Sequence, residues 1–214
     1  MANPSRYQKS EALLKQALNT IPLGSQTFSK SLTQYPHGAS PYFIERAKGS
    51  RCWDVDGNEY VDFVNALCSV NLGHCDPDVS RAVREQLEKG TIFSLPHPLE
   101  MQLASKLVEL LPNAEMVRFG KNGSDATSAA VRIARAATGK DHIACCGYHG
   151  WQDWYIGATT RNLGVPKAVQ ELTHKFEYNN IDALHRIFTE HPGQIATVIM
   201  VPMNTTEPRA GFLG

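Results

Sequence analysis

Residues 115–201 alternate between short apolar runs and segments whose apolar residues recur at helical spacing. The expected strands and helices, in order, are 115–119, 126–137, 142–146, 181–188 and 195–201. Strands separated by helices pair in parallel, because each connection has to cross one face of the sheet. The last run, IATVIMV, is apolar on successive residues, so both of its faces need cover. The alternation therefore predicts an α/β fold, a parallel-rich sheet with helices on both faces.

The N-terminal part of the chain has a different character. A helix is expected over 7–18, and residues 41–63 contain three short runs that are rich in aromatic and β-branched residues. The Asp-Gly step at 56–57 predicts a hairpin with a type I′ turn, because both residues tolerate positive φ. We therefore expect a small N-terminal α+β segment over residues 1–70, followed by the α/β part over residues 71–214. Two further amphipathic helices are expected, ending at Gly90 and at Pro112.

Charge is balanced, with 21 Lys and Arg against 21 Asp and Glu. A neutral chain has no electrostatic preference for nucleic acid or for an anionic membrane, so function is expected from a local site. No stretch approaches the roughly 20 apolar residues of a membrane span, and residues 1–10 lack the apolar run of a signal peptide. We therefore predict no nucleic-acid or membrane partner and a cytoplasmic location.

The five cysteines include no C-x-x-C pair, which is typical of reduced thiols rather than of a disulfide framework. Cys145 and Cys146 are adjacent in an expected strand, so their side chains point to opposite faces of the sheet. They are therefore poorly placed to join His149 in a zinc site. No metal site is predicted.

The segment 118–135, RFGKNGSDATSAAVRIAR, leads from an expected strand through a glycine-containing loop into a helix that begins near Asp125. Backbone N–H groups and the positive end of the helix dipole suit such a loop to a phosphate, and the hydroxyls of Ser124 and Thr127 are possible further donors. Ser124 is equally well interpreted as a plain helix N-cap. The spacing matches neither a P-loop nor the G-x-G-x-x-G pattern, which argues against a nucleotide-binding domain.

A second candidate stretch, CCGYHGWQDW at 145–154, follows the expected strand 142–146. It should lie at the carboxyl edge of the sheet, where open α/β folds bind ligands. One of the aromatic rings in this stretch is suited to stacking on a planar cofactor, and His149 to hydrogen bonding or proton transfer. The alternative is that these aromatic residues pack against a neighbouring element. A hydrolase nucleophile elbow is not indicated, because the Gly-x-Ser-x-Gly pattern is absent.

Four motifs together resemble one known family. They are GSRCWDVDGNEYVDF, LGHCDPDVSRAVREQLEKG, AEMVRFGKNGSDATSAAVRIARAATGKDHIACCGYHGW and ATVIMVP with EPRAGFL. In this order they are similar to the N-terminal half of class III aminotransferases, in particular the glutamate-1-semialdehyde 2,1-aminomutase-like branch. The opening and the GYHGWQDWY loop more weakly resemble members that act in nucleotide-sugar and polysaccharide pathways.

The resemblance implies a fold-type I enzyme that moves an amino group with pyridoxal 5′-phosphate (PLP). It also implies a small-molecule amino donor and acceptor and a homodimer, in which residues near 91–98 reach toward the partner's phosphate. By the same resemblance, the phosphate loop and the aromatic turn supply the cofactor-binding residues. These are Asn122, Gly123, Ser124, Asp125, Tyr148 and His149.

The sequence departs from the family pattern at the catalytic groups. The Schiff-base lysine and the aspartate that pairs with the ring nitrogen fall beyond Gly214 in the family, and Lys121 belongs to the phosphate loop at the wrong end of the ring. Where the family commonly reads Glu-Pro, this chain reads Val201-Pro202. We therefore predict no catalytic residue in these 214 residues and no turnover by them alone. The alternative is a non-catalytic fragment or homologue that keeps the phosphate-binding and dimerisation surfaces.

Overall fold

The computed structural model describes residues 6–203 and 205–213. The chain divides into two compact units, the first ending at His97 and the second beginning at Pro98. The boundary that the sequence predicts, between residues 70 and 71, lies earlier in the chain. No helix among the described residues is long and apolar enough to cross a bilayer.

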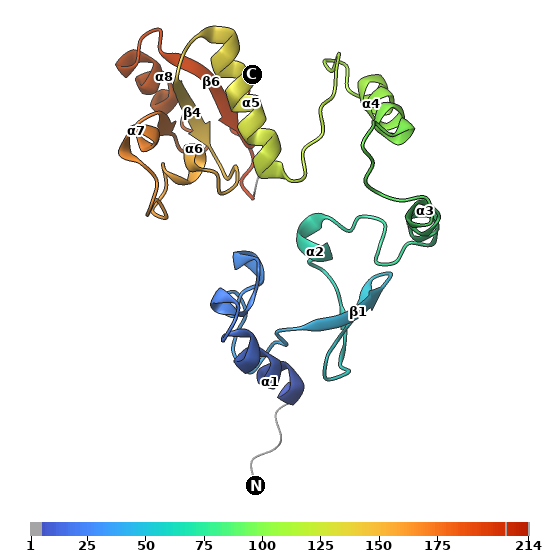
Figure 1. Cartoon of the computed structure of the whole chain (residues 1–214). Coiled ribbons are helices and arrows are strands. Elements are labelled where there is room, and N and C mark those ends of the chain that lie inside the picture. The colour runs from blue at the N-terminus through green and yellow to red at the C-terminus, as the bar shows by residue number, and fades with distance from the viewer. Residues whose placement is uncertain (1–5, 204, 214) are drawn as a thin grey trace. The chain divides into compact units, whose positions relative to one another are not determined.

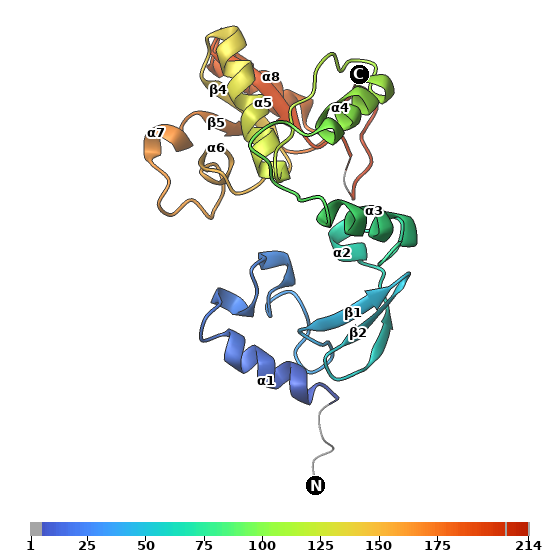
Figure 2. The same cartoon turned by 45° about the vertical axis from the view of Figure 1, so that its right-hand side comes forward.

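The first unit is a small antiparallel sheet with short helices (Figure 2). The order of its strands is β1-β2-β3, which confirms the small antiparallel sheet expected over 41–63. Asn65 to Cys68 all have positive φ, so the turn labelled α2 is left-handed. In chain order the elements are α1 (Gln8–Ala17), η1 (Pro22–Gly24), η2 (Phe28–Lys30), β1 (Ile44–Lys48), β2 (Arg51–Asp54), β3 (Glu59–Val61), α2 (Asn65–Cys68) and α3 (Pro77–Leu87).

The hairpin between β2 and β3 forms as predicted, but the type I′ turn was wrong. Of the Asp-Gly step only Gly57 has positive φ, whereas a type I′ turn needs it at both central residues. The reason is the buried carboxylate of Asp54, which accepts the N–H groups of Asp56 and Asn58 at 3.0 and 2.8 Å and holds a wider turn. Burial by itself raises the pKa of Asp54, but hydrogen bonds from Asn58 and Tyr60 outweigh it and the pKa is lowered.

The second unit contains a parallel sheet with the strand order β5-β4-β6. The strand expected at 142–146 is confirmed, and the one expected at 195–201 ends at Met200. The elements are α4 (Pro98–Leu110), α5 (Gly123–Thr138), β4 (His142–Cys146), α6 (Asp153–Ile156), α7 (Lys167–Gln170), β5 (Thr173–Lys175), α8 (Ile181–Glu190) and β6 (Ile195–Met200).

Helices cover both faces of this sheet, as Figure 1 shows for α5 and α8. On one face Cys146 packs with Ile187 of α8, and on the other Cys145 packs with Val131 of α5 and Trp154 of α6. The adjacent cysteines therefore point to opposite faces, as the strand alternation predicts. Burial raises the pKa of Cys145 to about 12, so this thiol is an apolar core group.

The strand predicted at 115–119 was wrong. Residues 116–120 have no regular secondary structure, and Met116 and Phe119 are exposed. A strand requires a neighbour for its backbone N–H and C=O groups, and none of the described strands pairs with this segment. Apolar composition alone does not supply that neighbour.

Candidate functional site

The helix α5 begins two residues earlier than the sequence predicts, and Asn122 is its N-cap. The Asn122 side chain accepts the N–H of Asp125 at 3.0 Å. The Asp125 carboxylate in turn accepts the N–H of Lys121 at 3.1 Å, so this acid fastens the loop that enters the helix. Ser124 lies inside the first turn, which excludes the interpretation of Ser124 as the N-cap.

The first turn of α5 leaves donors free. Within the described part of the chain, no group accepts a hydrogen bond from the N–H of Gly123 or of Ser124. These groups stand at the positive end of a 16-residue helix. Free N–H groups at a helix N-terminus are the donors that proteins use for phosphate and carboxylate groups.

The aromatic loop after β4 is held against this first turn. The hydroxyl of Thr127 donates to the carbonyl of His149 at 2.8 Å, which ties the loop to α5. The single hydroxyl proton of Thr127 is thus directed to the backbone, and Thr127 is not the additional phosphate donor that its position suggests. Gly150, with φ of +111°, lies so close that a Cβ built on it would stand 2.1 Å from Ser124 Oγ. Only glycine permits this approach.

The base of the loop rests on the end of β6. Gly147 has φ of +93°, and a Cβ built on it would stand 2.6 Å from Cγ2 of Val201. The side chain of Val201, which stands where the resemblance implies glutamate, is an apolar contact of the loop. The hydroxyl of Tyr155 donates to the Gly147 carbonyl at 2.9 Å and fixes the same turn.

His149 and Tyr148 face different surroundings although they are neighbours. His149 is buried, at 7% exposure, and its Nε2 donates to the carbonyl of Cys146 at 2.8 Å, which assigns the proton to Nε2. Tyr148 is 71% exposed, and its ring meets Tyr155 edge-on with the centroids 5.6 Å apart. The structure thus gives His149 a part in holding the loop and leaves the face of Tyr148 available.

A cavity of about 490 Å³ joins the helix terminus to the aromatic loop. Five of the six predicted cofactor-binding residues line it, whereas Asp125 does not. None of the lining residues is acidic or carries an amino or guanidinium group, so the electrostatic attraction for an anion comes from the N-terminus of α5. The lining residues are Asn122, Gly123, Ser124, Thr127, Tyr148, His149, Gly150 and Trp151.

Two of these residues were not singled out from the sequence as ligand contacts. Gly150 and Trp151 complete the wall, and Trp151 is 69% exposed. The position of Gly150 between two aromatic residues is the sequence pattern that could have pointed to it. The need for glycine there comes from its contact with Ser124, which is 26 positions earlier in the chain.

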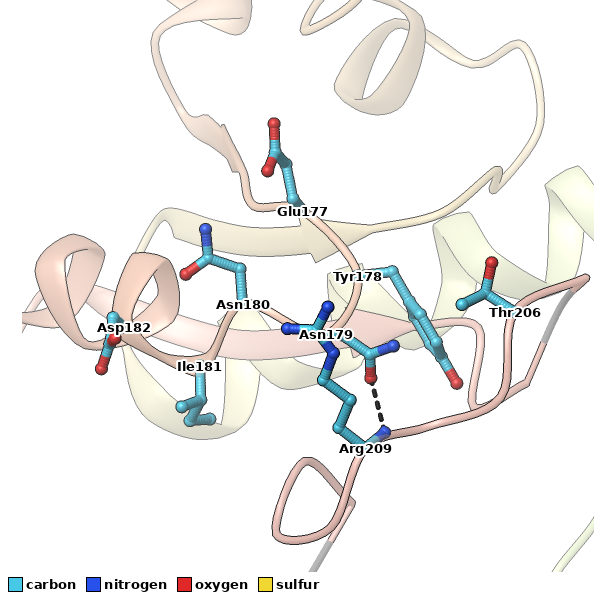
Figure 3. Close-up of a pocket in the computed structure, with 8 residues that line it drawn as sticks. All are labelled: Glu177, Tyr178, Asn179, Asn180, Ile181, Asp182, Thr206 and Arg209. Atoms are coloured by element: carbon cyan, nitrogen blue, oxygen red, sulfur yellow. Dashed lines mark hydrogen bonds between the residues drawn. The ribbon is translucent and has the colours of Figure 1, made fainter.

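A second cavity, of about 410 Å³, lies where β5 leads into α8 (Figure 3). Asn179, which has positive φ, accepts the N–H of Arg209 at 2.8 Å and donates to the carbonyl of Glu207 at 3.0 Å. These bonds fasten the segment after β6 to the start of α8. None of the predicted cofactor-binding residues lines this cavity.

The fold and the cavity define an α/β domain with free N–H groups at a helix N-terminus beside an aromatic wall. Residues 34–205 match the family described as Aminotransferase class-III, and the chain belongs to this family. Among curated relatives, the glutamate-1-semialdehyde 2,1-aminomutase of Desulforamulus reducens is 40% identical and matches 97% of this chain and 51% of its own length. The 3-aminobutyryl-CoA aminotransferase of Cloacimonas acidaminovorans is 36% identical and matches 100% of this chain and 52% of its own length.

Solved structures share the fold. The FumI protein of Sphingopyxis sp. MTA144, in its PLP internal aldimine form, superposes with a TM-score of 0.82 at 32% identity, over 89% of this chain and 45% of that protein. The solved structures that share the fold are fold-type I PLP transaminases. The second unit is part of the large domain of that fold. The chain spans about half the length of the curated relatives that it matches.

Proposed function

We propose that the chain is part of a PLP-dependent enzyme that moves an amino group, and that the cavity at the N-terminus of α5 holds the cofactor. The observation that carries this proposal is the pair of free N–H groups at Gly123 and Ser124, which face a cavity with the exposed ring of Tyr148 in its wall. Family membership and the PLP of the FumI structure support it.

The residues present fit such a cofactor. PLP has a phosphate at one end and a flat heteroaromatic ring at the other, and it acts as an electron sink for the bond changes next to the substrate amino group. The two free N–H groups and the positive helix end suit the phosphate. A Cβ built on Gly123 would meet no heavy atom within 4 Å, so the space above this residue is open to a ligand.

In the proposed site the residues bind and orient rather than react. Ser124 supplies an N–H and a hydroxyl to the phosphate, and Tyr148 covers one face of the ring. The N–H of Asp125 is taken by Asn122 and its carboxylate by Lys121, so its proposed part in cofactor binding is to hold the loop in shape. No amino group lines the cavity, so the nucleophile must come from a residue that is not among the eight lining it.

Ser124→Ala in the full-length protein is expected to raise the dissociation constant for PLP about 10- to 100-fold. Loss of a hydrogen bond to a charged group costs about 1.5–3 kcal/mol, and each 1.4 kcal/mol is tenfold in affinity. Titration of the cofactor-free protein with PLP measures the change. Thr138→Ala, at the other end of α5, is the matched control. An unchanged constant in Ser124→Ala would contradict the proposed phosphate contact.

Tyr148→Ala is expected to weaken PLP retention about 2- to 10-fold, because aromatic stacking is worth about 0.5–1.5 kcal/mol. Tyr148→Phe should be mild, since stacking needs the ring and not the hydroxyl. Dialysis rates and the absorption of the bound cofactor provide the measurement. The opposite ranking of the two variants would place Tyr148 in a hydrogen-bond network instead.

The proposal extends to a small-molecule amino donor and acceptor and to a cytoplasmic homodimer. The helix α4 supports association, because apolar side chains such as Leu99, Leu103 and Leu110 are exposed along it. All five cysteines are free thiols, which suits a reducing compartment. That residues near 91–98 reach the partner's phosphate stays part of this proposal.

A further inference from the structure

Three histidines of the second unit converge at one place. His142 is the first residue of β4, His174 is the central residue of β5, and His191 directly follows α8. Each ring offers one nitrogen, and these three nitrogens all lie within 4.8 Å of one another. The grouping is not local in sequence, because the three residues come from three separate elements.

The strand register brings the histidines together. His174 pairs with Ala144, and His142 lies two residues before Ala144 in the same strand. Side chains alternate along a strand, so His142, Ala144 and His174 are on one face of the sheet. This is the face that α8 covers, since Ala144 packs in the same cluster as Ile187. His191, directly after α8, lies beside this pair.

The contacts within the cluster are close. His142 Nδ1 and His174 Nε2 lie 2.8 Å apart and share one proton. The rings of His174 and His191 stack with the centroids 3.9 Å apart, and those of His142 and His191 are 5.0 Å apart. All three residues are partly buried, so they are held by their surroundings and yet remain accessible to a small ion.

The surroundings of His174 favour its uncharged ring. Burial, His191 and His142 lower the pKa of His174, and the opposing influence of Glu190 does not reverse this. A neutral imidazole has a lone pair, and it is the form that binds metal ions.

We propose that His142, His174 and His191 bind a divalent first-row transition-metal ion, and we commit to Zn²⁺. Imidazole ligands suit zinc, copper and nickel, whereas magnesium and calcium require oxygen ligands. Zinc binds imidazole nitrogen at about 2.0–2.1 Å in a tetrahedron, which places two ligand nitrogens roughly 3.3 Å apart. The hydrogen-bonded pair, 2.8 Å apart, therefore has to open by about half an ångström, and a nitrogen at the 4.8 Å limit has to approach by about 1.5 Å.

A bound ion has a mechanical consequence. It joins the paired strands β4 and β5 to the end of α8, a helix that otherwise lies on the sheet through apolar packing. Water can take the fourth position of the tetrahedron. His142 is at the start of β4, whereas the aromatic loop of the proposed cofactor cavity follows the end of β4. The zinc proposal therefore does not depend on the proposed function.

Titration of chelator-treated full-length protein with ZnCl₂, followed by calorimetry, tests the proposal. We expect one zinc per chain with a dissociation constant of about 1 µM or lower, and no response to MgCl₂. Single changes His142→Ala, His174→Ala and His191→Ala should each weaken binding by more than about tenfold, because even outer-shell partners of a metal site cost 10- to 100-fold. His185→Ala is the matched control, an exposed histidine of α8 outside the cluster.

Equal zinc affinity in the parent and in all three cluster variants would overturn the proposal and leave the cluster a hydrogen-bonded stack only. A second measurement uses the unmutated protein, so that the test does not depend on whether the variants fold. The Cu²⁺-loaded parent should give an electron paramagnetic resonance spectrum with splitting from several nitrogen ligands, and a spectrum without nitrogen splitting would also overturn it. PLP affinity should be unchanged in His191→Ala, which separates this result from any failure of the proposed function.

Discussion

Gly150→Ala is expected to remove about 2–6 kcal/mol from the free energy of unfolding of the second unit. Two effects add. The residue has φ of +111°, which an L-residue adopts at a cost of about 1–3 kcal/mol. The new Cβ would also stand 2.1 Å from Ser124 Oγ and 2.8 Å from Ser124 Cβ, and relieving such overpacking typically costs another 1–3 kcal/mol.

The same change should raise the dissociation constant for PLP by more than about tenfold, because either the loop or the first turn of α5 has to move and both line the same cavity. Chemical denaturation measures the stability of the full-length protein, and titration with PLP measures the affinity.

Gly164→Ala is the matched control for backbone strain. Gly164 has φ of +86°, but a Cβ built there meets no heavy atom within 4 Å. Gly164→Ala should therefore show the strain alone, with PLP affinity unchanged. Ser124→Gly in the Gly150→Ala background should recover part of the lost stability, since it removes both of the atoms nearest to the new Cβ. Equal losses in Gly150→Ala and Gly164→Ala would mean that the contact with Ser124 is not the cause.

Gly123→Val is expected to weaken PLP binding strongly while leaving the stability of the fold almost unchanged. A Cβ at this position meets no heavy atom within 4 Å, and φ there lies outside the left-handed range, so the effect on stability should stay within about 1 kcal/mol. The branched side chain would occupy the open space in front of the two free N–H groups. Loss of both charge-assisted bonds corresponds to about 3–6 kcal/mol, or two to four decades in PLP affinity.

Thermal unfolding and PLP titration of Gly123→Val test this pair of expectations. Gly123→Ala should be intermediate in affinity, because its methyl group is smaller. A valine variant that binds PLP as tightly as the parent would show that the phosphate does not lie over Gly123. A variant that unfolds easily would show that the glycine is needed by the fold itself.

Elements form as the sequence predicts where the pattern that specifies them lies within one segment. The helices at 126–137 and 181–188 and the strand at 142–146 form because their apolar periodicity is a property of the segment itself. Residues 115–119 have the same composition as a strand but no pairing partner among the described strands. The hairpin turn forms at the Asp-Gly step, yet its type follows from the carboxylate of Asp54, which lies outside that step.

From the sequence alone, the candidate site was predicted as two loops, in which six of the eight lining residues were singled out. Phosphate loops and aromatic turns are local patterns of residue type, and a single chain segment displays them completely. The tertiary structure decided what these residues do there. It made Asn122 the cap and left the N–H of Ser124 free, directed the Thr127 hydroxyl to His149, and brought Gly150 against α5. It also gathered three histidines through strand register. Hydrogen-bond partners and close contacts join residues that are distant in the chain, so only the folded arrangement assigns them.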